Sequence, residues 1–167
     1  GLYRAAHPSP MTAPRETREE AAAKGREFLK SMGAGGSFTE AVQYNAEPQK
    51  WVFLQQSLGT EEARRRIGEG LPIGAWRLRW FIPEQLEEWK VSIDRGGIVG
   101  FEHVIEESAS GASLTIADAR ALAESFIVAR GWSLDSLKNL EASSFKNANR
   151  TDHFFMWEKV GSAVAWR

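Results

Sequence analysis

The stretch TREEAAAKGREFLKSMG, from Thr17 to Gly33, decides the fold because it carries the signals of one short amphipathic helix. Thr17 at its start and Glu20 three residues later form a capping-box pattern, in which each side chain satisfies a backbone N–H group that a helix leaves unpaired. Gly33 supplies the residue that most easily adopts the left-handed conformation at a helix end. Small and apolar residues at helical spacing predict one buried stripe. The stripe consists of Ala21, Gly25, Phe28, Leu29 and Met32.

The stretch TIADARALAESFIVARG, from Thr115 to Gly131, repeats this pattern at a constant offset of 98 residues. Thr115 and Asp118 take the places of Thr17 and Glu20. The stripe of the second helix consists of Ala119, Leu122, Ala123, Phe126 and Ile127, and three of these match the first stripe as identical or similar residues. A long internal period predicts a duplicated structural unit.

Two strand-like runs follow each helix. The runs are residues 38–44 and 50–55 after the first helix, and residues 140–146 and 152–158 after the second. Aromatic residues alternate on the second run of each pair, with Trp51 and Phe53 in one and Phe155 and Trp157 in the other. Alternation with a period of two places these rings on one face of a sheet. Each unit is therefore predicted to run helix, strand, polar turn, aromatic strand.

The first unit continues with more elements. We expect a short helix at residues 61–67 capped by Thr60, and strands at residues 75–82, 88–94 and 98–106. Residues 94–97, Asp-Arg-Gly-Gly, form a tight hairpin turn in this prediction, because glycine adopts positive φ. Trp76, Leu78, Trp80 and Ile82 share one face of the first of these strands, and Arg77, Arg79 and Phe81 share the other.

These elements predict an α+β protein with the following organisation. Residues 1–15 form an extended or disordered linker rich in proline, residues 16–107 the first unit, and residues 108–167 the second. The second unit has no counterpart of the hairpin at residues 88–106, so we expect it to be incomplete at its C-terminal end. Its sheet would then keep an open edge able to pair with another chain.

Composition excludes several classes of function. The chain has 167 residues with 21 basic and 22 acidic side chains, and this balance argues against a nucleic-acid-binding protein. The absence of cysteine excludes disulfides, thiolate zinc sites and cysteine nucleophiles. No stretch approaches the length of a membrane span. Five of the seven tryptophans fall on predicted strands, which assigns them to the fold first: Trp51, Trp76, Trp80, Trp89 and Trp157.

A capped helix, two strands and an aromatic hairpin resemble the PepSY module, a small extracytoplasmic domain with one helix on an antiparallel sheet. Residues 89–99, WKVSIDRGGIV, look like its strand-turn-strand ending. Residues 119–131 and 150–158, RTDHFFMWE, are similar to the soluble N-terminal region of bacterial CAAX-type (CPBP family) membrane metalloproteases. The resemblance covers residues 16–160. It implies a non-catalytic regulatory or substrate-presenting domain on the periplasmic side, tethered by transmembrane helices of a parent protein.

Motifs that could carry chemistry have ordinary structural explanations. Residues 61–66, EEARRR, contain the Glu-Glu-x-x-x-Arg pattern of the CAAX-type active site, but they lie on a short polar helix without histidine partners. The metal candidates are His103, Glu102 and Glu106, and a strand would split them between two faces. The neighbours Asp152 and His153 likewise point to opposite faces, so they do not suggest a triad.

The remaining candidate is a binding surface formed by Arg77, Arg79, Phe81 and His153. We expect no catalytic residue, no cofactor and no metal in this segment. The favoured function is binding of a peptide or protein. Expected partners include the parent protein's own membrane domain and a second copy paired through the open sheet edge. Nucleic acid is not an expected partner. The alternative is a ligand-binding or enzymatic domain with a pocket between helix and curved sheet.

Overall fold

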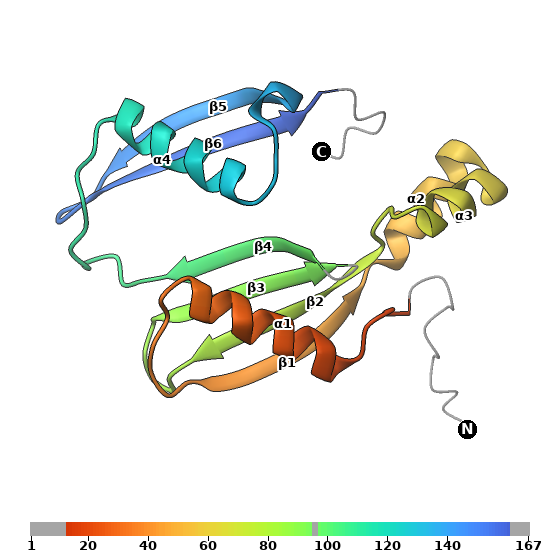
Figure 1. Cartoon of the computed structure of the whole chain (residues 1–167), viewed down its shortest axis with the longest axis horizontal. Helices are drawn as coiled ribbons and strands as arrows, with labels where there is room; N and C mark the ends of the chain where they lie inside the picture. The colour runs from red at the N-terminus through yellow and green to blue at the C-terminus, as the bar shows by residue number, and fades with distance from the viewer. Residues whose placement is uncertain (1–12, 95–96, 161–167) are drawn as a thin grey trace. The chain divides into compact units, whose positions relative to one another are not determined.

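The computed structural model describes residues 13–94 and 97–160. The chain divides into two compact units, Gly1–Ile105 and Glu106–Arg167, and each is described by itself. Both contain a helix packed on antiparallel strands, which confirms the α+β class (Figure 1). The expected linker falls mostly on residues 1–12, outside the described residues. No helix in the described part of the chain has the length and apolar character needed to cross a membrane.

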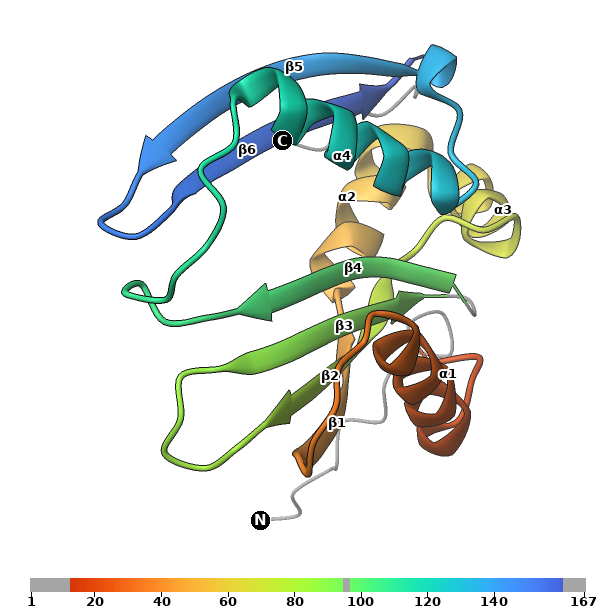
Figure 2. The ribbon, with the colours of Figure 1, turned by 60° about the vertical axis from the view of Figure 1, so that its left-hand side comes forward.

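Unit 1 is built around a four-stranded antiparallel sheet with the order β1-β2-β3-β4. Its elements are α1 (Arg18–Ser31), β1 (Thr39–Ala46), α2 (Pro48–Leu58), α3 (Thr60–Gly68), β2 (Gly74–Phe81), β3 (Glu88–Asp94) and β4 (Gly97–Val104). Helix α1 packs against β1, β2 and β3 on one face of the sheet (Figure 2). The predicted hairpin turn includes Arg95 and Gly96, which lie outside the described residues.

Helix α1 begins and ends as the sequence predicts. The Thr17 side chain accepts a hydrogen bond from the Glu20 N–H at 3.2 Å, and the Glu20 carboxylate accepts one from the Thr17 N–H at 2.8 Å. Gly33 has a φ of 78°, the left-handed conformation expected after a helix end. Gly25 lets the helix approach the sheet closely, because a Cβ there would lie 2.6 Å from Leu78 and 2.8 Å from Trp80.

The core of unit 1 lies between α1 and the sheet. Trp80 and Leu78 of β2 face α1, as do Trp89, Val91 and Ile93 of β3, which confirms the predicted inward faces. Their partners on the helix are Ala22, Phe28 and Leu29. Side chains of the helix and of the two central strands fill this core.

The segment predicted as a strand at residues 50–55 is instead part of helix α2, and this prediction was wrong. Pro48 occupies the first turn, where a missing N–H costs nothing and the fixed φ suits a helix. Leu54 is buried against Ala63 and Ile67 of α3, with Trp51 packed beside them. Helices α2 and α3 therefore form a hairpin with its own small core, inserted between β1 and β2. The N-cap of α3 is Gly59, and Thr60 is its first residue.

Unit 2 repeats the first part of unit 1. It contains α4 (Ile116–Ala129), a short 3₁₀ helix η1 (Leu134–Ser136), β5 (Leu137–Lys146) and β6 (Thr151–Lys159). Helix α4 and strand β5 begin 98 residues after α1 and β1, which confirms the offset. The Thr115 hydroxyl caps α4 by accepting from the Asp118 N–H at 3.2 Å. The two strands form an antiparallel pair that α4 covers on one face.

The counterpart of β6 in unit 1 is β2, not residues 50–55. In unit 1, Trp76 of β2 donates its indole N–H to the carbonyl of Glu16, one residue before the cap Thr17. In unit 2, His153 of β6 makes the same contact with the carbonyl of Leu114, one residue before the cap Thr115. The two units thus share a helix-strand-strand arrangement in which the α2–α3 hairpin is an insertion.

Candidate functional site

The predicted surface of Arg77, Arg79 and Phe81 lies on the sheet face of unit 1 that points away from α1. The Arg79 guanidinium lies 4.5 Å from the centroid of the Phe81 ring and also pairs with the Glu88 carboxylate. Arg77 donates to the Ser92 hydroxyl. The three side chains are therefore together, but they are held by partners on the neighbouring strand.

Glu88 organises the charges of this face. Hydrogen bonds from Lys90 and, to a smaller extent, from Arg79 lower the pKa of the Glu88 carboxyl. The hydrogen bonds that Lys90 donates to the carboxylates of Glu88 and Glu102 raise the pKa of Lys90. Arg79 and Lys90 lie directly opposite each other on β2 and β3, and the carboxylates of Glu88 and Glu102 pair with them. Such a surface offers no excess of positive charge to attract a phosphate backbone.

The metal candidates are not brought together. Strand β4 ends at Val104, so Glu106 does not share a strand face with Glu102 as the sequence analysis expected. His103 bonds Glu87 at 2.8 Å and its ring stacks on Trp89 with a centroid distance of 3.6 Å. Among residues 13–94 and 97–160, no group of three or more potential His, Asp or Glu ligands is positioned to hold a metal ion.

The Glu-Glu-x-x-x-Arg pattern forms a surface ion-pair network on α3. Glu62 pairs with Arg65 at 2.5 Å and with Arg66 at 2.8 Å, and Glu61 pairs with Arg64 at 3.1 Å. Hydrogen bonds from Arg65 and Arg66 lower the pKa of Glu62 to about 2. The pattern therefore stabilises a solvated helix, with acidic residues in its first turn and basic residues in its last.

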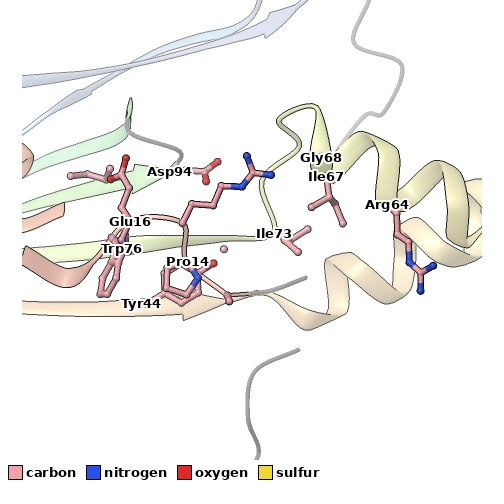
Figure 3. Close-up of a pocket in the computed structure, with 13 residues that line it drawn as sticks. Pro14, Glu16, Tyr44, Arg64, Ile67, Gly68, Ile73, Trp76 and Asp94 are labelled. Atoms are coloured by element: carbon pink, nitrogen blue, oxygen red, sulfur yellow. The ribbon is translucent and has the colours of Figure 1, made fainter. Parts of the chain in front are cut away.

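A cavity of about 390 Å³ lies at one end of the unit 1 sheet, beside α3 (Figure 3). Tyr44 and Trp76 line it together with Ile67, and Arg15 and Asp94 contribute charged groups. It lies where the α2–α3 hairpin joins the sheet. A second cavity of about 250 Å³ lies between α1 and the sheet, where the alternative function places a pocket, and Leu29, Phe38 and Trp80 line it.

Unit 2 presents a different surface, because it covers few of its apolar side chains. None of its described residues is buried, and all of the buried hydrophobic residues of the described chain belong to unit 1. The large apolar residues exposed in unit 2 are Leu114, Ile116, Leu122, Phe126, Val128, Trp132, Leu140, Phe145, Phe154, Met156 and Val160. A helix that is apolar on several sides is typical of a buried helix.

The repeat shows what unit 2 lacks. Phe28 of α1 is 7% exposed and packs edge-to-face on Phe101 of β4, with ring centroids 5.3 Å apart. Phe126 occupies the same position in α4 and is 42% exposed. The Arg130 guanidinium lies 4.9 Å from the centroid of the Phe126 ring. Because unit 2 contains no described counterpart of β3 or β4, no strand of the described chain covers Phe126 as β4 covers Phe28. Leu122, one turn earlier, is 63% exposed.

The free edge of β6 adjoins this apolar surface. The Thr151 N–H is donated to the Ala112 carbonyl at 3.2 Å, on the side away from β5, so the backbone groups of alternate residues point the same way. These residues are His153, Phe155, Trp157 and Lys159, and within the described part of the chain no third strand pairs with them. We call Leu122, Phe126 and the β6 edge from His153 to Lys159 the open site.

His153 is the one predicted surface residue that lies at the open site. Its ring is fixed on both sides, because Nε2 donates to Leu114 and Nδ1 bonds the Ser144 hydroxyl at 2.8 Å. Sequence reasoning missed Phe126 and Leu122, which it assigned to a buried stripe. A signal was present, since Leu122, Val128 and Ile116 replace Lys24, Lys30 and Arg18 of the first helix.

Comparison of the chain with protein families, with curated proteins and with solved structures finds no match. The resemblance to the PepSY module and to CAAX-type proteases therefore stays a prediction.

Proposed function

We propose that this chain is a non-catalytic module that binds extended polypeptide at the open site of unit 2. The observation that supports this most directly is the contrast between Phe28 and Phe126, which hold the same helix position but are 7% and 42% exposed. Exposed contiguous apolar side chains beside an unpaired strand edge are typical of protein–protein interaction sites. The ion pairs of unit 1 and the dispersed titratable groups give catalysis no comparable support.

The resemblance to the PepSY module extends this proposal. As an extracytoplasmic domain of a CAAX-type membrane protease, the module would hold polypeptide for, or regulate, the parent's membrane domain. The sequence of the parent gene tests this extension. Hydrophobic spans flanking the module, with paired glutamates and histidines downstream, would support it, and a parent protein without such spans would contradict it.

Binding itself is tested with a permanently unfolded polypeptide, such as a reduced and carboxymethylated globular protein carrying a fluorescent label. Fluorescence anisotropy should show saturable binding to the chain. Phe126→Lys places a charge in the open site and should weaken binding at least about tenfold, whereas Val128→Lys, on the opposite side of α4, should leave it unchanged. Equal binding by both variants would contradict the proposal.

A second candidate function is favoured by the cavity of unit 1. Its aromatic and charged lining suits a small polar aromatic molecule. Gly68 lines the cavity and has open space at its Cβ position, so Gly68→Trp would place a side chain there. A compound that raises the melting temperature of the unsubstituted chain but not that of Gly68→Trp would support this function. A metabolite screen that finds no such compound would argue against it.

A further inference from the structure

The open site also defines the chemistry of its occupant. We propose that β6 accepts a strand of a second polypeptide, antiparallel to β6, with bulky apolar side chains at alternate positions facing α4. This inference rests on the proposed function and specifies both the pairing and the sequence of the partner.

The backbone of β6 supports strand addition at this edge and not at the edge of β5. Natural edges are protected by charges, prolines and bulges. Strand β5 has an irregularity between Asn139 and Glu141 and carries Lys138, Glu141 and Lys146. The run from His153 to Trp157 on β6, HFFMW, has no Asp, Glu, Lys, Arg or Pro. The central part of the β6 edge therefore lacks the features that prevent pairing, and charges occur only at the two ends of the strand, at Asp152, Glu158 and Lys159.

Unit 1 shows which side chains fit. The contacts with the residue before each N-cap align His153 with Trp76, so Phe155 takes the place of Leu78 and Trp157 that of Trp80. In this alignment the pairing of the two strands is shifted by two residues from the offset of 98, because Trp76 pairs with Tyr44 and His153 pairs with Ser144 beyond the irregularity of β5. In unit 1, these β2 positions pair with β3 in the register Trp76↔Ile93, Leu78↔Val91 and Trp80↔Trp89. All three β3 residues are buried. The occupant should thus carry the pattern Trp-x-Val-x-Ile or a similar alternation.

Charge adds one further preference. In this register, the residue two positions before the tryptophan of the occupant lies opposite Lys159. An acidic side chain there would pair with the lysine across the strands. The corresponding residue before β3 is Glu87, so the template from unit 1 already carries this charge.

A second copy of unit 2 does not fit the same edge. Helix α1 packs against β1, β2 and β3, so its axis runs over the middle strand β2, and the repeat places α4 over β6. Pairing of β6 with β6 would bring two such helices within about 5 Å, the spacing of adjacent strands. Packed helices need about 8–10 Å. The occupant is therefore a strand with no helix of its own on that face.

The probe is a synthetic peptide with the sequence of residues 86–94, LEEWKVSID, titrated into the ¹⁵N-labelled chain. We expect binding with slower amide exchange, by at least about tenfold, at His153, Phe155, Trp157 and Lys159. N-methylation of the peptide valine should abolish binding, because its N–H faces β6, while N-methylation of the adjacent serine should not. A peptide of the same composition with its apolar residues contiguous should bind at least about tenfold more weakly.

Several outcomes would overturn the inference. Equal binding of both N-methylated peptides would exclude strand pairing, although Phe126-dependent binding of unfolded polypeptide would still support the proposed function. Slow exchange of the amides of His153, Phe155, Trp157 and Lys159 before any peptide is added would show that the edge is already filled. If the protein then sediments as a monomer, the chain's own residues after Val160 would fill it. If it sediments as a dimer, a second copy would fill it. Failure of the peptide to bind at about 1 mM would also overturn it.

Discussion

Truncation of one phenylalanine in each unit tests the difference in packing between the two repeats. Phe28→Ala removes a ring that is 7% exposed and enclosed by α1, β3 and β4. Deletion of a buried phenylalanine side chain costs roughly 3–5 kcal/mol, since lost transfer free energy and a cavity both contribute. Phe126→Ala removes a ring that is already 42% exposed, and the space that it leaves opens to solvent. Its cost should be about 1–2 kcal/mol.

Native-state hydrogen exchange measures these changes separately in each unit, because amides of α1 and β2 report on unit 1 and those of α4 and β6 on unit 2. A global melting curve is less suitable, since two units need not unfold in one transition. The loss of opening free energy should be larger for Phe28→Ala by about 2 kcal/mol. Equal losses would refute the reasoning, because they would mean that Phe126 is enclosed in solution as fully as Phe28.

Three further predictions concern the scaffold. Gly25→Ala should destabilise unit 1 by about 1–2 kcal/mol despite the better helix propensity of alanine, because the added Cβ would clash with the sheet. Ala123→Gly at the matching position of α4 should cost about 1 kcal/mol through helix propensity alone. Hydrogen exchange measures both costs, and a Gly25→Ala variant more stable than the unsubstituted chain would contradict the close packing. The pKa of Glu62 is lowered to about 2 from its ordinary 4.5, so the stabilisation by this carboxylate is complete above pH 4.5 and is lost as the pH falls towards 2. Glu62→Gln should therefore flatten the dependence of the urea unfolding midpoint on pH in this window. An unchanged dependence would count against the ion-pair network. Replacement of residues 47–73 by the turn of residues 147–150 should keep the exchange protection of α1 and the sheet, and its loss would show that the inserted hairpin supports the core.

The repeat was predictable because helix ends carry local signals. Capping by Thr17 and Thr115 needs only one side chain and the backbone three residues on, so sequence spacing alone locates it. The strand-like run at residues 140–146 lies within β5, which begins at Leu137, 98 residues after the start of β1. Alternation likewise predicted the two faces of β2, because Arg77 and Arg79 alternate with the apolar residues Trp76, Leu78 and Trp80.

The error at residues 50–55 came from a short apolar run that fits either period. Trp51 and Phe53 alternate like strand residues, yet Trp51, Leu54 and Leu58 also follow helical spacing, and those three are the residues that contact the α2–α3 core. Pro48 at the helix start was the signal that could have decided between them. Residues 45–48 lie between the two strand-like runs, where the repeat pattern places a polar turn, and this pattern hid the signal.

The open site could not be predicted from periodicity, because a helical stripe shows which residues can be buried and not what buries them. Phe28 and Phe126 are identical in type and position, and only the tertiary structure separates a covered ring from an uncovered one. The sequence indicates this difference at one matching position, where the first helix has Lys24 and the second has Leu122. It becomes informative once the two helices are compared position by position.

The same comparison separates the roles of the two units. Unit 1 adds two features to the shared helix-strand-strand arrangement, namely the α2–α3 hairpin with its cavity and the β3–β4 hairpin that closes the core under α1. Within the described residues unit 2 adds neither, and it keeps apolar side chains where unit 1 has lysine and arginine. An apolar helix face beside the unpaired, uncharged run from His153 to Trp157 is costly to leave in water. A bound strand that resembles β3 would remove both costs at once, because its backbone would pair with β6 while its side chains covered Phe126.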